Sequence, residues 1–201
     1  MRSEFVPPIQ EFTRALNTGD QKQKKSLIFL TGFMGSGKST IGPILANTLG
    51  FDFVDVDKLI EQQEKERVVD IFEKKGEEAF RVLERRALHE LSSREGCVVS
   101  LGGGTIANEE NFQIVHRNGV IVYLQLSPEE ILQRVQHRPD RPLLRDGAGK
   151  PLAREQMEGR IVELLERREP FYTRADIIVP SDRKRVGFMV DEIVKKLRRY
   201  V

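Results

Sequence analysis

Cysteine is almost absent from the chain, which has 201 residues and one cysteine, Cys97. A single cysteine excludes an internal disulfide framework and any zinc site built from several cysteines. No apolar run approaches the roughly 18 residues that a membrane-spanning helix needs. Because the N-terminal segment contains Glu4 and Glu11 and no long apolar stretch, we expect no secretory signal. These absences predict a soluble, cytoplasmic protein.

An excess of charge of either sign is also missing, because 33 basic residues are balanced by 31 acidic ones and the formal net charge is +2. We therefore expect no large surface for nucleic acid or membrane, whereas small anionic ligands are not excluded. Apolar residues make up 39% of the chain and charged residues 32%, which is too apolar for a disordered chain. The length fits one domain with its own core, and we expect a monomer.

Short apolar segments alternate with helical patterns from Ser26 onward. We predict strands at residues 27–30, 51–54, 97–101, 119–124 and 176–179. Continuous apolar strands separated by helices indicate an α/β fold with a parallel sheet covered on both faces. The stretch from 138 to 150 contains two prolines and two glycines and has no periodicity. It is typical of a mobile loop between helices.

The N-terminal residues 1–24 differ from the rest of the chain. Ile9, Phe12 and Leu16 have loose helical spacing, and a polar run follows them. Two interpretations stay open, a frayed tail or a short helix docked on the domain or on a partner. We therefore divide the chain into an N-terminal extension, residues 1–24, and one domain, residues 25–201.

A glycine-rich loop follows the first predicted strand. Residues 32–39 have the sequence GFMGSGKS and fit the pattern G-x-x-x-x-G-K-[ST]. Glycines let backbone N–H groups turn toward phosphate oxygens, and the next helix points its positive end at the same anion. Lys38 can reach the β- and γ-phosphates, and the Ser39 hydroxyl can bind Mg²⁺. We predict nucleotide contacts from Gly35, Ser36, Gly37, Lys38, Ser39 and Thr40.

Two aspartates, Asp55 and Asp57, stand at the carboxyl end of the second predicted strand. Open α/β sheets place ligands at that end, and alternation along an extended segment sends both carboxylates the same way. One carboxylate can hold the hydration shell of Mg²⁺, and the other can orient a substrate hydroxyl or accept its proton. Alternatively, Asp57 is only a helix N-cap, because a helical pattern follows it directly.

Arginines and glycines form a third group of candidates. Arg81 lies one turn before Glu84, and the two could form an ordinary surface ion pair worth only about 0.2–0.5 kcal/mol. Residues 102–104 are three glycines after the third predicted strand, and they suit either close approach to a ligand or a plain flexible turn. Arg141 and Arg168 add cations. Phosphoryl transfer needs cations on the transferred group, and an anionic substrate needs forked donors.

Taken in order, these motifs resemble the shikimate kinase family. Besides the loop and the aspartate pair, the chain contains FRVLE at 80–84, GGG at 102–104, RPLL at 141–144 and REPFY at 168–172. The resemblance extends from about residue 26 to the C-terminus. It implies ATP-dependent phosphorylation of the 3-hydroxyl of shikimate to shikimate 3-phosphate, in the chorismate branch of aromatic amino acid biosynthesis. It also implies the P-loop kinase fold, with a five-stranded parallel sheet in the order 2-3-1-4-5.

For the acceptor, the resemblance implies individual roles. Asp57 is expected to bind the substrate hydroxyls and to act as a base or an orienting group. Arg81 and Arg168 are expected to hold the carboxylate of shikimate. Gly103 and Gly104 are expected to line the same site.

For the nucleotide, the resemblance implies a catalytic role for Lys38 and for Arg141, which comes from a lid over about residues 138–150. Arg134 is expected to pack on the adenine. Asp55 is expected to order Mg²⁺ through water, together with Ser39. The third predicted strand ends without an acidic residue, so the usual Walker B aspartate is missing, and this favours Asp55 as the carboxylate on the metal side.

Two rival functions stay open at this stage. One is a kinase of another small hydroxy acid, such as gluconate, on the same fold. The pairing of Arg81 and Arg168 with Asp57 favours shikimate, which is a ring acid, over gluconate. The other is a non-catalytic nucleotide-binding module that holds a partner through residues 1–24. The combined presence of Lys38 and the other predicted catalytic residues argues against it.

Overall fold

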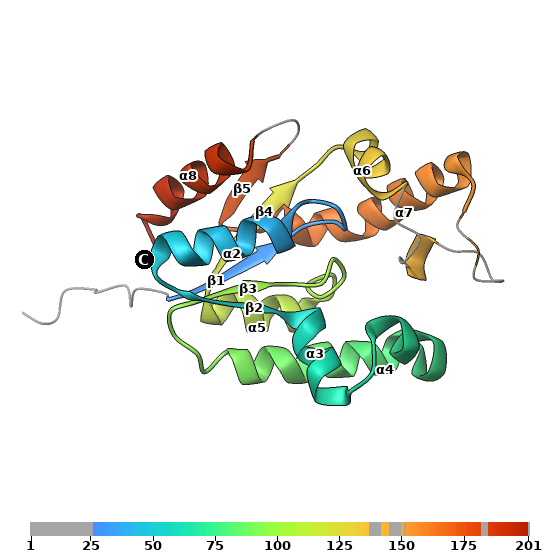
Figure 1. Ribbon diagram of the computed structural model, residues 1–201, viewed down its shortest axis with the longest axis horizontal. Helices are drawn as coiled ribbons and strands as arrows, with labels where there is room; N and C mark the ends of the chain where they lie inside the picture. Colours follow the sequence, from blue (N-terminus) through green and yellow to red (C-terminus); the bar gives the residue numbers. More distant parts are fainter. Residues whose placement is uncertain (1–25, 137–141, 145–149, 151, 182–184, 201) are drawn as a thin grey trace, which may run out of the picture.

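The computed structural model describes residues 26–136, 142–144, 150, 152–181 and 185–200. Within them, a parallel five-stranded sheet has the strand order β2-β3-β1-β4-β5 (Figure 1). This confirms the predicted α/β fold and its strand order. The strands are β1 (Leu27–Thr31), β2 (Asp52–Asp55), β3 (Cys97–Ser100), β4 (Val120–Gln125) and β5 (Ile177–Pro180).

Helices connect successive strands and cover both faces of the sheet (Figure 1). In chain order they are α2 (Lys38–Leu49), α3 (Val56–Glu64), α4 (Val68–Leu91), α5 (Glu109–Asn118), α6 (Pro128–Val135), the 3₁₀ helix η1 (Pro142–Leu144), α7 (Arg154–Tyr172) and α8 (Val186–Leu197). No described helix is long and apolar enough to cross a membrane.

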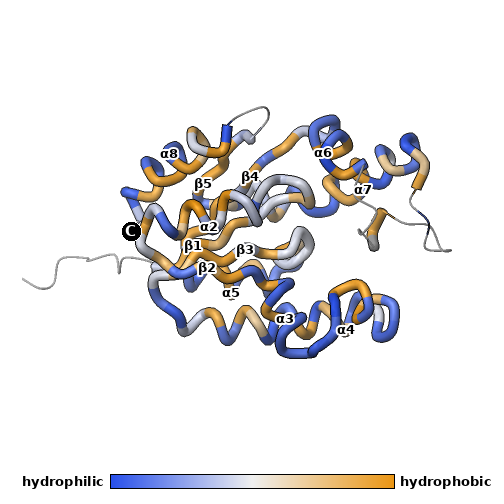
Figure 2. The backbone as a smooth tube through the Cα atoms, viewed as in Figure 1, coloured by the Kyte–Doolittle hydropathy of each residue, from blue (hydrophilic) through white to orange (hydrophobic). Residues whose placement is uncertain are grey.

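The strands supply the core of both layers, because successive side chains point to opposite faces. Leu27 and Phe29 pack in a cluster with residues of α4 and α5, whereas Ile28 and Leu30 pack with residues of α2 and α8. Figure 2 shows the hydrophobic residues along the central strands. Such two-sided burial explains why the strands have continuous apolar sequences.

A third apolar cluster joins the phosphate loop to the helices after β4. Phe33 of the loop packs in it with residues of α6 and α7 and with Leu144 of η1. The N–H of Leu152 also donates to the carbonyl of Leu144 at 3.0 Å. The cluster therefore holds η1 against the domain. The remaining residues of the predicted lid, apart from Lys150, lie outside the described residues, as do Arg141 and residues 1–24.

Gly76 divides α4 into two parts. Its backbone has φ 80° and ψ 172°, a conformation that essentially only glycine adopts. A Cβ there would have open space around it, so the backbone angle and not crowding requires glycine. The part of α4 after this break contains Arg81 and Glu84.

Candidate active site

The glycine-rich loop joins β1 to α2 and has the geometry of a phosphate cradle. Gly35 and Gly37 have φ of 82° and 95°, in the left-handed region that favours glycine. Since Gly37 is the N-cap of α2, the loop leads directly into the positive end of that helix. The Lys38 ammonium group donates to the carbonyls of Gly32 at 2.7 Å and Phe33 at 3.1 Å. The loop thus places the Lys38 ammonium group beside the positive end of α2.

Other predicted nucleotide contacts lie around this loop. Ser36 is buried within it, whereas Ser39 and Thr40 are exposed in the first turn of α2. Arg134 of α6 donates to the carbonyl of Gly35 at 3.1 Å and to that of Ser181, after β5, at 3.4 Å. Arg134 therefore lies beside the loop, and its side chain is close enough to contact a nucleotide that the loop binds.

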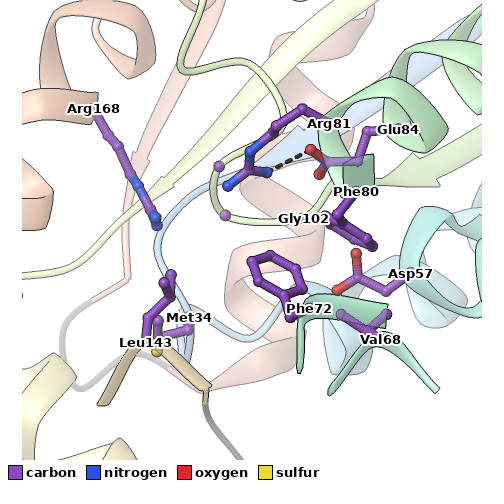
Figure 3. A pocket seen from close by; sticks show the side chains of 12 residues that line it. Met34, Asp57, Val68, Phe72, Phe80, Arg81, Glu84, Gly102, Leu143 and Arg168 are labelled. Carbon is purple, nitrogen blue, oxygen red and sulfur yellow. Dashed lines mark hydrogen bonds and ion pairs between the residues drawn. The ribbon is translucent and has the colours of Figure 1, made fainter. Parts of the chain in front are cut away.

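The two aspartates have different positions. Asp55 is the N-cap of α3, and its Oδ1 accepts from the N–H groups of Asp57 at 3.1 Å and Lys58 at 3.3 Å. The interpretation of Asp57 as the helix cap is therefore wrong. Alternation along an extended segment does not apply to this pair, because β2 ends at Asp55 and Asp57 lies in the first turn of α3. Of the two, only Asp57 lines the pocket shown in Figure 3.

Half-buried Arg81 forms an ion pair with the buried carboxylate of Glu84. Glu84 is 1% exposed and accepts from Nη1 of Arg81 and from the hydroxyl of Thr105. The alternative of an ordinary surface ion pair is therefore wrong. A second carboxylate, that of Glu77, accepts from Arg81 Nη2 at 2.6 Å. Burial lowers the pKa of Arg81, but the two carboxylates outweigh it and the pKa is raised, so the guanidinium stays charged.

The three glycines after β3 allow two guanidinium groups to approach the backbone. A Cβ on Gly104 would lie 2.5 Å from Arg81 Nη2, and one on Gly103 would lie 3.3 Å from Arg168 Nη1. Arg168 is 5% exposed, and its guanidinium lies 5.3 Å from the centre of the Phe33 ring. A plain flexible turn would not need such contacts. The loop instead brings two buried or half-buried cations against adjacent residues.

These groups surround a pocket of about 110 Å³ beside the phosphate loop. In Figure 3, Arg168 of α7 enters from the left, Arg81 of α4 from above and Asp57 of α3 from the right. The pocket is lined by Met34, Asp57, Val68, Phe72, Phe80, Arg81, Glu84, Gly102, Gly103, Gly104, Leu143 and Arg168. Its size and its mixture of two cations, two carboxylates and apolar walls suit a small anionic metabolite that also carries polar groups.

Sequence reasoning did not predict the apolar wall of this pocket. Val68, Phe72 and Phe80 come from α4, and Leu143 comes from η1. On an amphipathic helix, a side chain that lines a ligand pocket has the same spacing as one that packs in the core. Only Phe80, next to Arg81, and Leu143, in the RPLL motif, stood in segments that signalled a place near the site.

Comparison with known proteins decides the family. The sequence model described as shikimate kinase matches residues 34–198 of the chain. The chain belongs to the shikimate kinase family. A relative named shikimate kinase, from Chlorobaculum parvum, is 51% identical over 176 residues, which are 88% of this chain and 94% of the relative. ATP-dependent phosphorylation of shikimate, in aromatic amino acid biosynthesis, is the activity of this family, and the predicted kinase function is confirmed.

Solved structures agree with the family. The shikimate kinase from Acinetobacter baumannii in complex with shikimate has a TM-score of 0.80 and 33% identity, and the match covers 89% of this chain and 95% of that one. A gluconokinase from Sinorhizobium meliloti has a TM-score of 0.54 and 19% identity over 87% of this chain and 93% of its own. That second likeness shows a shared fold alone. The prediction of the P-loop kinase fold is therefore confirmed.

Proposed function

We propose that the pocket holds shikimate beside the γ-phosphate of ATP and that the phosphoryl group is transferred to the 3-hydroxyl, giving shikimate 3-phosphate. The observation that carries this proposal is the polarity of the pocket, with Arg81 and Arg168 on two sides and Asp57 on another (Figure 3). A ring acid with a carboxylate at one end and hydroxyls at the other matches that polarity. The related Acinetobacter baumannii enzyme, which is in complex with shikimate, supports this assignment.

The carboxylate of the acceptor binds to Arg81 and Arg168. Guanidinium groups present N–H donors in a plane, which matches two carboxylate oxygens. Burial of Arg168 reduces competition from water and strengthens its attraction for the anion. Gly103 and Gly104 allow this approach because they have no side chain between the cations and the pocket. The rings of Phe72 and Phe80 cover the carbon face of the acceptor.

Asp57 binds the hydroxyl that is phosphorylated. The hydroxyl oxygen forms a bond to the γ-phosphorus while the bond from that phosphorus to the bridging oxygen of ADP breaks. The hydroxyl proton moves to Asp57 if the carboxylate acts as a base, whereas an orienting role needs only the hydrogen bond. In both cases Asp57 aligns the hydroxyl with the γ-phosphorus, and alignment is a large share of catalysis in phosphoryl transfer.

The phosphates of ATP bind to the loop and to the start of α2, through Gly35, Ser36, Gly37, Lys38, Ser39 and Thr40. Lys38 and Arg141, which lies outside the described residues, stabilise the charge on the transferred group. Arg134, beside Gly35, packs on the adenine.

Mg²⁺ fits the donors at this site. Among the described residues, no group of three or more His, Cys, Asp and Glu is placed to hold a metal ion. Mg²⁺ in kinases needs few protein ligands, because phosphate oxygens and water complete its octahedral shell. Ser39 would hold the ion through its hydroxyl, and Asp55 would hold it through water with its carboxylate. A bound Mg²⁺ would supply positive charge to the phosphates.

The experiment that tests this function is a coupled assay of ADP release with shikimate, with gluconate and without an acceptor. We expect turnover with shikimate alone and formation of shikimate 3-phosphate, identified by NMR. Turnover with gluconate would favour the other hydroxy acid. Nucleotide binding without turnover on any acceptor would favour a non-catalytic module.

The remaining parts of the proposal concern the whole protein. We propose a cytoplasmic monomer in which residues 25–201 form the catalytic domain and residues 1–24 are peripheral. Every assigned site residue follows Thr31, so removal of residues 1–23 is expected to leave turnover and Michaelis constants unchanged. A loss of more than about tenfold in a folded truncated protein would show that the extension contributes to the site.

A further inference from the structure

Tyr172 is the last residue of α7 and is completely buried. It follows Arg168 by four residues, so both side chains lie on the same face of that helix. Its hydroxyl donates to the carbonyl oxygen of Gly103, 69 residues earlier in the chain. Tyr172 therefore connects the helix that holds Arg168 to the glycine loop that lines the acceptor pocket.

The guanidinium of Arg168 lies at the same glycine, because a Cβ on Gly103 would come 3.3 Å from Arg168 Nη1. Burial raises the pKa of Tyr172 to about 12, while the charge of Arg168 and a hydrogen bond from it act to lower that pKa. The phenol is therefore protonated at neutral pH and can donate to Gly103. Tyr172 and Arg168 thus meet at Gly103, and Gly103 and Arg168 both line the pocket.

The ring of Tyr172 is held independently of its hydroxyl. It packs against the ring of Tyr123, with 4.9 Å between the ring centres and 33° between the planes. Tyr123 is fixed in turn, because its hydroxyl donates to Glu169 at 2.8 Å. Loss of the Tyr172 hydroxyl alone should therefore leave the ring in place, which separates an effect on the pocket from an effect on packing.

We propose that Tyr172 is a positioning residue for the acceptor: its hydroxyl fixes both the backbone at Gly103 and the guanidinium of Arg168, so that they hold the carboxylate of the acceptor together. Tyr172 does not line the pocket and acts only through these two residues. The inference rests on the proposed carboxylate site. It adds a residue that determines affinity for the acceptor without contacting it.

The test is Tyr172→Phe, with Tyr123→Phe as the matched control. We expect Tyr172→Phe to raise the KM for shikimate about tenfold, because one hydrogen bond that orients a charged donor is lost. The turnover number and the affinity for ATP should change by less than about twofold, since the phosphate loop and Asp57 are not touched. Tyr123→Phe removes a hydroxyl from the neighbouring ring, bonded to Glu169 only, and should leave the KM unchanged.

A second readout separates positioning from general loosening of the fold. Wild-type protein should prefer shikimate over its methyl ester, which lacks the negative charge, and Tyr172→Phe should reduce that preference about as much as it raises the KM. An unchanged KM for shikimate in Tyr172→Phe would overturn the inference. The inference would also be overturned if Tyr172→Phe weakened ATP and shikimate binding equally, or if this variant failed to fold. Either result would show that the hydroxyl has a purely structural role.

Failure of the inference can be told apart from failure of the proposed site by Arg168→Ala in the same assay. If Arg168→Ala raises the KM for shikimate and Tyr172→Phe does not, the carboxylate site stands and the role of Tyr172 falls. If neither variant changes the KM, the carboxylate is bound elsewhere and both are wrong.

Discussion

The guanidinium of Arg81 lies against the backbone of Gly104, so close that a Cβ on this glycine would come within 2.5 Å of Nη2 and 2.9 Å of the guanidinium carbon. The opposite side of Arg81 is fixed by the buried carboxylate of Glu84. The cation is therefore enclosed between a backbone that has no side chain and an anion that has little access to water. This contact explains the glycine at position 104 without any appeal to flexibility.

Gly104→Ala should therefore displace Arg81 and weaken acceptor binding. We expect the KM for shikimate to rise by about tenfold or more, as for a lost charge-assisted contact, with ATP affinity unchanged. Steady-state kinetics with each substrate varied in turn checks this. Gly159→Ala in α7 is the control, because a Cβ there meets no atom within 4 Å. A KM that stays at the wild-type value in Gly104→Ala would show that the position of Arg81 is not important for the acceptor.

Asp57→Asn should separate chemistry from stability. Because Asp55 and not Asp57 caps α3, the loss of charge at Asp57 affects the helix only through its first-turn position, about 0.3–1 kcal/mol. We expect turnover at saturating shikimate to fall by roughly a hundredfold or more, because Asn cannot accept the proton or balance the nearby cations. A melting curve and an ATP titration on the same preparation should be close to wild type. Asp52→Asn, at the exposed start of β2, should keep normal turnover.

The fold could be predicted from the sequence because its signals are local and repeated. Five apolar segments, each followed by a helical pattern, specify a parallel sheet. The ends of the elements were predicted less accurately. Strand β2 stops at Asp55, and the side chain of Asp55 accepts from N–H groups in the first turn of α3. That one change of conformation gives Asp55 and Asp57 different surroundings, which alternation along a strand could not predict.

The sequence predicted only part of the site, because the two halves of the site differ in how they are built. The phosphate loop has one contiguous motif, whereas the acceptor pocket is assembled from α3, α4, η1, α7 and the loop after β3. The buried Glu84 accepts a hydrogen bond from Thr105, 21 residues later, whereas sequence spacing on α4 alone describes an exposed pair. The same holds for Tyr172, whose partner Gly103 is 69 residues away. Contacts of this range come from tertiary packing and leave no local pattern.

Glu84→Gln should loosen Arg81 and destabilise the fold. The carboxylate is buried and accepts from both Arg81 and Thr105, so a neutral replacement weakens the ion pair and leaves the half-buried Arg81 less compensated. We expect the free energy of unfolding to fall by about 1–3 kcal/mol and the KM for shikimate to rise. Urea denaturation and steady-state kinetics check the two effects. Glu110→Gln, whose carboxylate is exposed, should change neither.

Buried tyrosines should make the protein lose stability in alkaline solution. Burial raises the pKa of Tyr172 to about 12, above its usual value near 10, so the folded state keeps the proton that the unfolded state releases. The contribution of Tyr172 to the free energy of unfolding is therefore constant below about pH 10 and falls as the pH rises from there to about 12. Denaturation midpoints at pH 8 and pH 11 should differ less in Tyr172→Phe than in wild type. Equal differences would show that Tyr172 ionises normally.

The central claim is that Arg81 and Arg168 bind the carboxylate of the acceptor, and the most direct measurement is the ratio of kcat/KM for shikimate to that for its methyl ester. In wild type this ratio should be large, on the order of a hundred, and in Arg81→Ala it should fall about tenfold or more, because the donor that recognises the charge is gone. The control Arg85→Ala, on the same helix but paired with Glu110 outside the pocket, should keep the wild-type ratio. A ratio that is as large in Arg81→Ala as in wild type would contradict the account, since the charge of the acceptor would then be recognised somewhere else.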